Sequence, residues 1–321
     1  MRTLPILVFV LLSTALWAQS PQARLTYEDR SGTTGHTLVI DGKSFGPYKD
    51  VTSVTHSTSA TAGLFVVTKR DKTYIVAQGK ETGPLPTGYD LDQSWVSDDG
   101  KVWAVTATHT DDATDDSEGS SQTQLWVNGK LYGPFQSLST FEYAETGGSW
   151  IASVQIGEEE YGVLVNGASR GSFQSVEHVW MFPDGKGWGY AGTDADGKTK
   201  VVTQDRTYDD IRDYNFDQMY PRNTHWGLGF KIGEEEELIL VDGKIYPGYL
   251  NFTGLLITYS GRHWGFEAEK LTDAGDYPAV VVDGKEYVGE GLSAGDLGGK
   301  ESFVWTVKDG SKVTVQVLTL P

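Results

Sequence analysis

The densest set of potential metal ligands in the sequence is a short acidic run. It places five carboxylates within eight residues, at Asp111, Asp112, Asp115, Asp116 and Glu118. Because calcium prefers several oxygen ligands, the run raises the hypothesis of a calcium site. It lacks the alternating ligand pattern of EF-hand loops, however, and acidic runs of this kind are often solvated segments. A solvent-exposed loop without a metal is therefore the alternative.

A second set of residues could bind ligands through aromatic rings. Trp95, Tyr143, Trp180, Tyr220 and Tyr259 lie on or beside the segments that we expect to be the innermost strands of a repeat. If those strands line a central channel, the rings would surround its mouth and could stack on sugar rings or hold a peptide. The alternative is that the rings only pack between sheets.

Catalytic chemistry is not indicated by any motif. His225 and His263 occupy the same position of a repeat, which favours a structural role over convergence on one site. The sequence contains no nucleophile elbow, no His-Glu-x-x-His helix and no phosphate-binding loop. We therefore expect a protein that is not an enzyme and carries no cofactor other than the hypothetical calcium.

An internal repeat positions these residues. Apolar runs ending in Asp-Gly, Asn-Gly or a degenerate version of it recur along the chain. The first turn residues of successive units are 37, 50, 38, 38, 38 and 41 residues apart. They are Asp41, Gln78, Asn128, Asn166, Gln204, Asp242 and Asp283.

Tryptophan is a second marker of the repeat. Trp150, Trp188 and Trp226 each precede their turn by 16 residues, and we assign Trp103, Trp264 and Trp305 to the same place. Two markers in phase make a chance periodicity improbable.

Each unit is predicted to form a four-stranded antiparallel meander, because Asp-Gly and Asn-Gly between apolar runs are strong hairpin signals. A unit of about 38 residues cannot bury both faces of its sheet, so it must stack on its own copies. The sequence therefore predicts an all-β fold, a β-propeller of four-stranded blades. Eight copies of the middle hairpin favour eight blades slightly over seven with a composite closing blade.

Residues 1–18 have a basic start, an apolar core and small residues before the expected cleavage point, as in a secretory signal peptide. Residues 19–321 would then form one propeller domain, secreted or periplasmic, without a transmembrane segment, and we expect a monomer. The chain contains no cysteine, and its net charge of -18 makes nucleic acid an unlikely partner.

The turns at Ser97–Lys101 and Phe182–Tyr190, together with the Val-Val-Asp-Gly-Lys segment before Glu286, resemble the repeats of TolB-like bacterial propellers. Blades of that family carry a Ser-Pro-Asp-Gly-Lys type of turn. The resemblance implies a propeller fold and an exported location, and no activity, because the shared motifs are structural turns.

Successive turns of a meander alternate between its two ends, so the Asp-Gly-Lys turns should lie on one side and the acidic hairpin loops on the other. We expect a non-enzymatic binding or scaffold protein that recognises a protein or peptide through the acidic loops or the channel. The alternatives are a carbohydrate-binding propeller and a hydrolase or lyase whose site is spread over several blades.

Overall fold

The computed structural model describes residues 25–32, 35–110, 121–215, 225, 227–232, 236–242 and 244–321. All regular secondary structure in these ranges is β-strand, and neighbouring strands pair antiparallel. The described part holds no helix long and apolar enough to cross a membrane. The predicted all-β class is confirmed.

Three complete sheets have four strands in sequence order. Their strands are β4 (Asp50–His56), β5 (Gly63–Lys69), β6 (Lys72–Ala77) and β7 (Lys80–Thr82); β8 (Asp90–Val96), β9 (Trp103–Thr110), β10 (Ser121–Val127) and β11 (Lys130–Phe135); and β12 (Ser137–Tyr143), β13 (Trp150–Gly157), β14 (Glu160–Val165) and β15 (Ala168–Phe173).

The first and last sheets have three strands each. They consist of β1 (Tyr27–Gly32), β2 (Gly35–Ile40) and β3 (Lys43–Tyr48), and of β28 (Glu290–Asp296), β29 (Glu301–Asp309) and β30 (Lys312–Thr319).

The fifth and sixth units are joined into one seven-stranded sheet, because β19 pairs with β18 through its first half and with β20 through its second. The strands are β16 (Ser175–Met181), β17 (Trp188–Thr193), β18 (Thr199–Thr203), β19 (Thr207–Asn215), β20 (Gly227–Ile232), β21 (Glu236–Val241) and β22 (Lys244–Pro247). The seventh unit contains β23 (Tyr249–Leu250), β24 (Leu255–Ile257), β25 (Trp264–Lys270), β26 (Tyr277–Val282) and β27 (Lys285–Val288).

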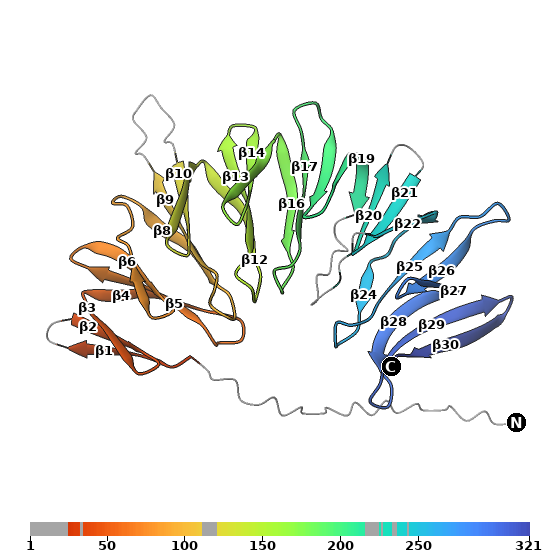
Figure 1. Cartoon of the computed structure of the whole chain (residues 1–321), viewed down its shortest axis with the longest axis horizontal. Helices are drawn as coiled ribbons and strands as arrows, with labels where there is room; N and C mark the ends of the chain where they lie inside the picture. Colours follow the sequence, from red (N-terminus) through yellow and green to blue (C-terminus); the bar gives the residue numbers. More distant parts are fainter. Residues whose placement is uncertain are drawn as a thin grey trace, which may run out of the picture.

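The sheets stack face to face in an open arc, with β1–β3 at one end and β28–β30 at the other (Figure 1). The described residues contain eight middle hairpins, which matches the predicted repeat. Because the arc is open, the closed ring of seven or eight blades stays a prediction. The strands point along the radius of the arc. The Asp-Gly and Asn-Gly turns that follow the third strand of each unit therefore lie on the concave side, and the loops of the middle hairpins lie on the convex side (Figure 1).

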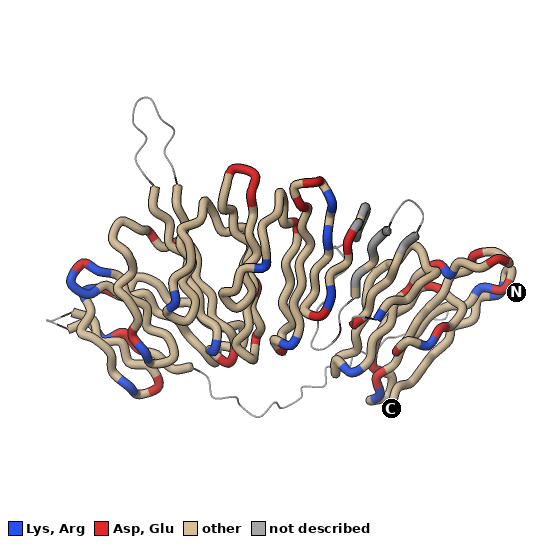
Figure 2. Tube along the Cα trace, turned by 45° about the horizontal axis from the view of Figure 1, so that its top comes forward, with Lys and Arg blue, Asp and Glu red and all other residues tan. Residues whose placement is uncertain are grey.

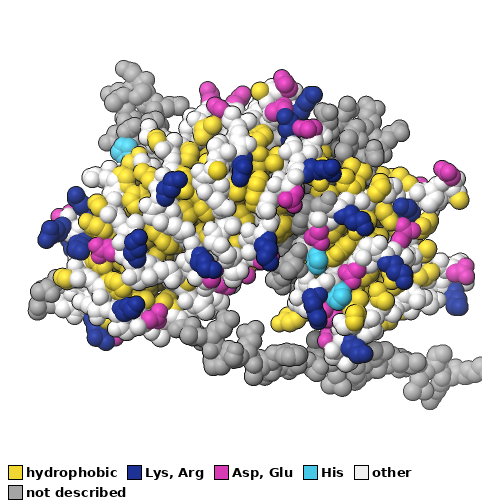
Figure 3. Space-filling model, in the orientation of Figure 1, with side chains coloured by type: hydrophobic (Ala, Val, Ile, Leu, Met, Phe, Trp, Pro, Cys, Tyr) yellow, Lys and Arg dark blue, Asp and Glu magenta, His cyan; other side chains and the backbone are white. Residues whose placement is uncertain are grey.

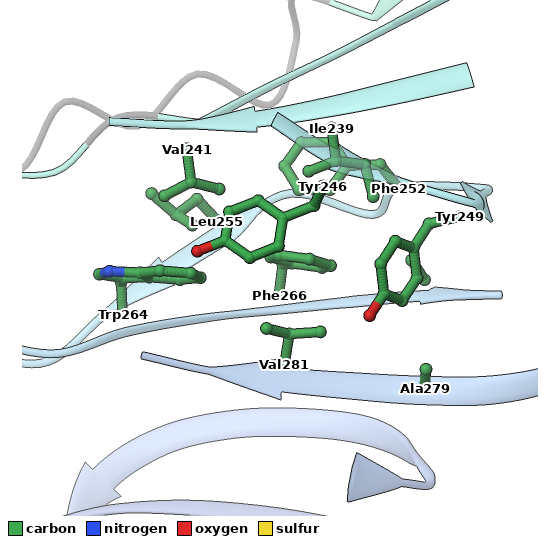
Figure 4. Close-up of a cluster of buried hydrophobic side chains, with 11 residues drawn as sticks. Ile239, Val241, Tyr246, Tyr249, Phe252, Leu255, Trp264, Phe266, Ala279 and Val281 are labelled. Atoms are coloured by element: carbon green, nitrogen blue, oxygen red, sulfur yellow. The ribbon is translucent and has the colours of Figure 1, made fainter. Parts of the chain in front are cut away.

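The core lies between neighbouring sheets. In the cluster shown in Figure 4, Ile239 and Val241 of one unit face Phe266, Trp264 and Val281 of the next. The rings of Trp264 and Phe266 stack at 7° with their centroids 6.1 Å apart. Alternating apolar residues on strands of both sheets thus supply each interface.

The two ends of the array differ in polarity. On β30 the side chains of Val313, Val315 and Val317 are 58%, 61% and 51% exposed. On β1 the outward face instead presents the exposed ion pair of Glu28 and Arg30. The first sheet therefore ends the array with a polar face and the last sheet with an apolar one.

One register prediction is wrong. In the regular units the backbone carbonyl of the marker Trp accepts the N–H of the turn residue, as Trp150 does from Asn166 at 3.0 Å. In the last unit the backbone carbonyl of Glu301 accepts the corresponding bond, from the N–H of Leu320 at 2.8 Å. Trp305 therefore lies four residues beyond the marker position. The β29–β30 hairpin is longer on that side than the Trp spacing suggested. Trp305 still packs against the Tyr of the preceding unit, Tyr287, as Trp150 packs against Tyr132.

Candidate functional site

The regular turns on the concave side are closed by a reciprocal pair of hydrogen bonds, which we call the turn clamp. The turn residue donates its backbone N–H to the carbonyl of the residue at the start of the second strand, and its side-chain Oδ1 accepts that residue's N–H. The Oδ1 distances are 3.0 Å for Thr26 to Asp41, 2.9 Å for Trp103 to Asn128, 2.8 Å for Trp150 to Asn166 and 3.0 Å for Trp264 to Asp283.

The clamp explains the residue types of the repeat. Asn128 has a φ of 53° and Gly129 a φ of 84°, the left-handed pair that a type I′ turn requires. Asn and Asp tolerate this conformation and also carry the oxygen that accepts the bond. The Asp-Gly and Asn-Gly pairs are thus accounted for by structure alone.

Further hydrogen bonds join neighbouring units along the concave side. The carboxylate of Asp99 accepts the N–H of Lys101 in its own turn at 3.0 Å and the N–H of Gly147 in the next unit at 2.9 Å. Partial burial acts to raise the pKa of Asp99, but these bonds, with the Lys101 ammonium and the Ser97 hydroxyl, outweigh it and lower the pKa to about 2. Asp99 therefore connects two sheets as a carboxylate.

The two histidines at one repeat position each pair with the turn residue of their own unit. The Nδ1 atom of His225 lies 2.5 Å from Asp242 Oδ2, and the Nδ1 atom of His263 lies 2.7 Å from Asp283 Oδ2. The hydrogen bond to Asp242 raises the pKa of His225, with burial acting against it. A His–Asp pair repeated in adjacent units supports the predicted role in bracing turns.

The predicted aromatic residues do not all lie together. Trp95 and Tyr143 are both half-buried and approach Phe141, with ring centroids 5.0 and 5.9 Å from it. Trp180 lies in a different core cluster and is 6% exposed, whereas Tyr259 is 92% exposed between β24 and β25. Tyr220 lies outside the described residues. Ligand contact by these rings stays a prediction.

The predicted calcium ligands, Asp111, Asp112, Asp115, Asp116 and Glu118, also lie outside the described residues, so the calcium site stays a prediction. Within the described ranges no three His, Asp or Glu side chains are grouped as metal ligands would be. The described convex loops carry both signs of charge: Figure 2 shows acidic residues at the tip between β13 and β14 and mixed charges between β17 and β18.

The fifth unit departs from the repeat at its turn. Gln204 still donates its N–H to the carbonyl of Trp188 at 3.0 Å. However, the described hydrogen bonds include none from its side chain, and neither Gln204 nor Asp205 has a positive φ. Thr203 closes this turn instead, through bonds from its N–H and hydroxyl to the Arg206 carbonyl at 2.8 and 3.0 Å.

The fourth unit departs at its last strand. Four residues after the turn marker most units have Phe or Tyr, and Tyr132 packs there against Trp150 of the next unit at 5.2 Å. In the fourth unit this place belongs to Arg170. Its guanidinium lies over the ring of Trp188, 5.1 Å from the centroid, so a cation–π contact replaces the aromatic pair.

Both departures line the same groove. A depression of about 890 Å³ is bordered by Arg170, Trp188, Gln204 and Arg206, with further lining residues from β15, β17, β18 and β19. A second pocket of about 420 Å³ shares Trp188, Thr203, Gln204 and Asp205 with it and also contains His225 and Asp242. The two volumes flank the turn of residues 203–206, and we call them together the seam groove.

The seam groove was not predicted from the sequence, although a signal for it was present. The turn at Gln204 is the degenerate copy of the motif, and Arg170, like Thr82 in the second unit, stands where the other units have Phe or Tyr. Departures from a local rule often mark functional sites. The sequence did not reveal that both departures meet, because Arg170 and Gln204 belong to different units.

Comparison with known proteins finds similarity to solved structures alone. No protein-family model matches the sequence, and no curated protein matches it. Solved structures to which the chain is similar include the β-propeller domain of the Trilobed protease from Pyrococcus furiosus, at 12% identity over 73% of this chain and 82% of that one, with a TM-score of 0.35. TolB from Acinetobacter baumannii matches at 18% identity over 69% of this chain and 62% of its own, with a TM-score of 0.28.

A Pyrococcus horikoshii acylaminoacyl peptidase matches at 13% identity over 90% of this chain and 56% of its own, with a TM-score of 0.33. The described residues by themselves show an all-β protein of antiparallel sheets, several of them four-stranded. The resemblance to TolB concerns the fold and is not accompanied by a matching sequence family.

Proposed function

We propose that this chain is an exported, non-enzymatic binding module that recognises an extended segment of a protein or peptide in the seam groove. The observation that supports this proposal is the shape of the groove. Two depressions share four lining residues and pass on both sides of one turn, which suits an extended chain better than a compact small molecule.

The curvature of the molecule agrees with this proposal. Repeat arrays that curve commonly use their concave side and its edges for binding. Asn166 borders the groove and is held by the turn clamp, with its Oδ1 2.8 Å from the Trp150 N, so this wall of the groove is anchored before a ligand arrives. An anchored site loses less conformational entropy on binding.

A peptide library displayed against the immobilised chain tests the proposal. We expect the full chain, expressed with its own N-terminal segment, to select a consensus sequence. Replacing the turn by the regular one, with Gln204→Asn and Asp205→Gly together, should abolish or change the consensus. Lys285→Gln, on a regular turn outside the groove, is the matched control and should leave it intact.

Selection of no consensus by the wild type, or of the same consensus by the turn variant, would contradict the proposal. Carbohydrate binding and a hydrolase or lyase activity remain separate predictions, and no feature of the seam groove favours them. Calcium binding by the acidic run is tested independently, by comparing thermal unfolding in calcium and in EDTA.

A further inference from the structure

The charges of the seam groove differ from those of the molecule as a whole. The chain has 44 acidic and 26 basic residues. The larger part of the groove is nevertheless lined by Arg170, Lys200 and Arg206, with Asp205 as its carboxylate. Lys and Arg are otherwise scattered over the face shown in Figure 3. The smaller part is lined by Asp184 and Asp242 beside Lys186, so the excess of positive charge is confined to the larger part.

The three cations are not equivalent. Lys200 is held by Asp194, with its ammonium 3.0 Å from Oδ2. Arg170 and Arg206 are exposed, and no ion pair joins either of them to another residue of the described ranges. Each instead lies near a ring of its own, Arg170 at 5.1 Å from the Trp188 centroid and Arg206 at 5.8 Å from that of Tyr208.

The backbone holds both arginines in place. The hydroxyl of Tyr190 donates a hydrogen bond to the carbonyl of Arg170 at 3.2 Å. The carbonyl of Arg206 accepts two bonds from Thr203, whose hydroxyl in turn accepts the Arg206 N–H at 3.2 Å. A guanidinium supported by a ring and an anchored backbone keeps its donors free for a planar anion, with less loss of side-chain entropy on binding.

From this arrangement we infer that the seam groove recognises carboxylates of an acidic peptide through Arg170 and Arg206. The inference rests on the proposed function and adds the chemistry of the ligand. Guanidinium donors match a carboxylate in a two-bond geometry, whereas an ammonium acts as a point charge. The repeat supports a specific role for arginine at this place, because five other units have Lys where the fifth unit has Arg206. They are Lys43, Lys80, Lys130, Lys244 and Lys285.

Binding of fluorescent hexaglutamate to the full chain, followed by anisotropy, tests the inference, with hexaglutamine and hexalysine as reference peptides. Hexaglutamate should bind at least about 10-fold more tightly than either, and less tightly as salt rises. Arg170→Tyr and Arg206→Gln should each weaken it about 10-fold. Lys285→Gln, at the equivalent place beside Tyr287, is the control and should change it less than about 2-fold.

Arg170→Tyr restores the residue type of the regular units, so the variant protein should fold. Thermal unfolding of the variant checks this. Asp205→Asn removes the carboxylate that lines the larger part of the groove and should tighten binding. Equal binding of hexaglutamate and hexaglutamine, or unchanged binding in both arginine variants, would overturn the inference. Tighter binding of an oligogalacturonate that depends on the same arginines would also overturn it, in favour of an acidic polysaccharide.

Failure of the inference is distinguishable from failure of the proposed function. A peptide library that yields a consensus without acidic residues, unaffected by Arg170→Tyr, contradicts the carboxylate assignment and leaves peptide binding standing. A library that yields no consensus contradicts both.

Discussion

Two turns at the same repeat position, Asn128–Gly129 and Gln204–Asp205, are built differently. At the first, the Asn128 side chain accepts the N–H of Trp103 and donates to the carbonyl of Lys101 at 2.8 Å, and both turn residues have positive φ. At the second, the side-chain clamp is absent among the described bonds, and Thr203 closes the turn. The difference indicates that the residues of the repeat consensus serve to close the turn, because the unit that lacks them closes it by other bonds.

The largest expected effect is at the regular turn. Asn128→Ala removes two side-chain hydrogen bonds and puts Ala, which tolerates the left-handed conformation less well than Asn, at a φ of 53°. It should therefore lower the free energy of unfolding by about 2–4 kcal/mol. Gln204→Ala should cost less than about 0.5 kcal/mol, because it loses no described bond. Urea unfolding of both variants measures the difference, and equal costs would contradict the role of the clamp.

The next effect concerns the pH dependence of stability. The pKa of Asp99 is lowered to about 2 from an unfolded value of 3.8, so its contribution is present above about pH 4 and is lost as pH falls through 2. Asp99→Asn should therefore remove about 1–2 kcal/mol of stability at pH 5 and much less at pH 2. The matched control is Asp184→Asn.

Asp184 bonds within its own turn, to the Lys186 N–H at 2.9 Å, and the described bonds give it no partner in the next unit. Its replacement should have a smaller effect over the same pH range. Unfolding in urea at several pH values provides the measurement. A wild-type and an Asp99→Asn curve that stay parallel from pH 5 to pH 2 would rule out the carboxylate link between sheets.

A smaller effect is expected from repairing the irregular turn. Gln204→Asn with Asp205→Gly restores the type I′ sequence, and we expect a gain of about 0.5–1.5 kcal/mol in the free energy of unfolding. Thermal unfolding detects it as a higher midpoint. A lower midpoint would mean that the backbone of residues 203–206 is imposed by its surroundings and not by its sequence.

The smallest effect is expected at Arg170. Arg170→Tyr replaces a cation–π contact by the aromatic pair of the regular units and should stabilise the protein by about 0.5–1 kcal/mol. The reverse change, Tyr132→Arg, should destabilise by at least as much, since the Tyr132–Trp150 contact is lost. Thermal midpoints of both variants test this pair, and shifts of the same sign would contradict it.

The sequence was sufficient for the fold class and for most of the repeat. Turns of Asp-Gly and Asn-Gly follow local rules that need no partner, so strand order and the position of each clamp could be predicted from residue types. The prediction for Trp305 failed because the spacing of a Trp does not report the length of the hairpin that follows it. Hairpin length in the last unit is fixed by cross-strand pairing.

What the sequence by itself determined is therefore local: eight middle hairpins, turns that lie together on one side of the sheets, and a degenerate turn at Gln204. Only the tertiary structure showed that β15 and the turn of residues 203–206 face each other, so that Arg170 and Arg206 share one groove. The physical reason is that a turn is specified by the backbone conformations of a few adjacent residues, whereas a binding site is specified by how separate sheets pack.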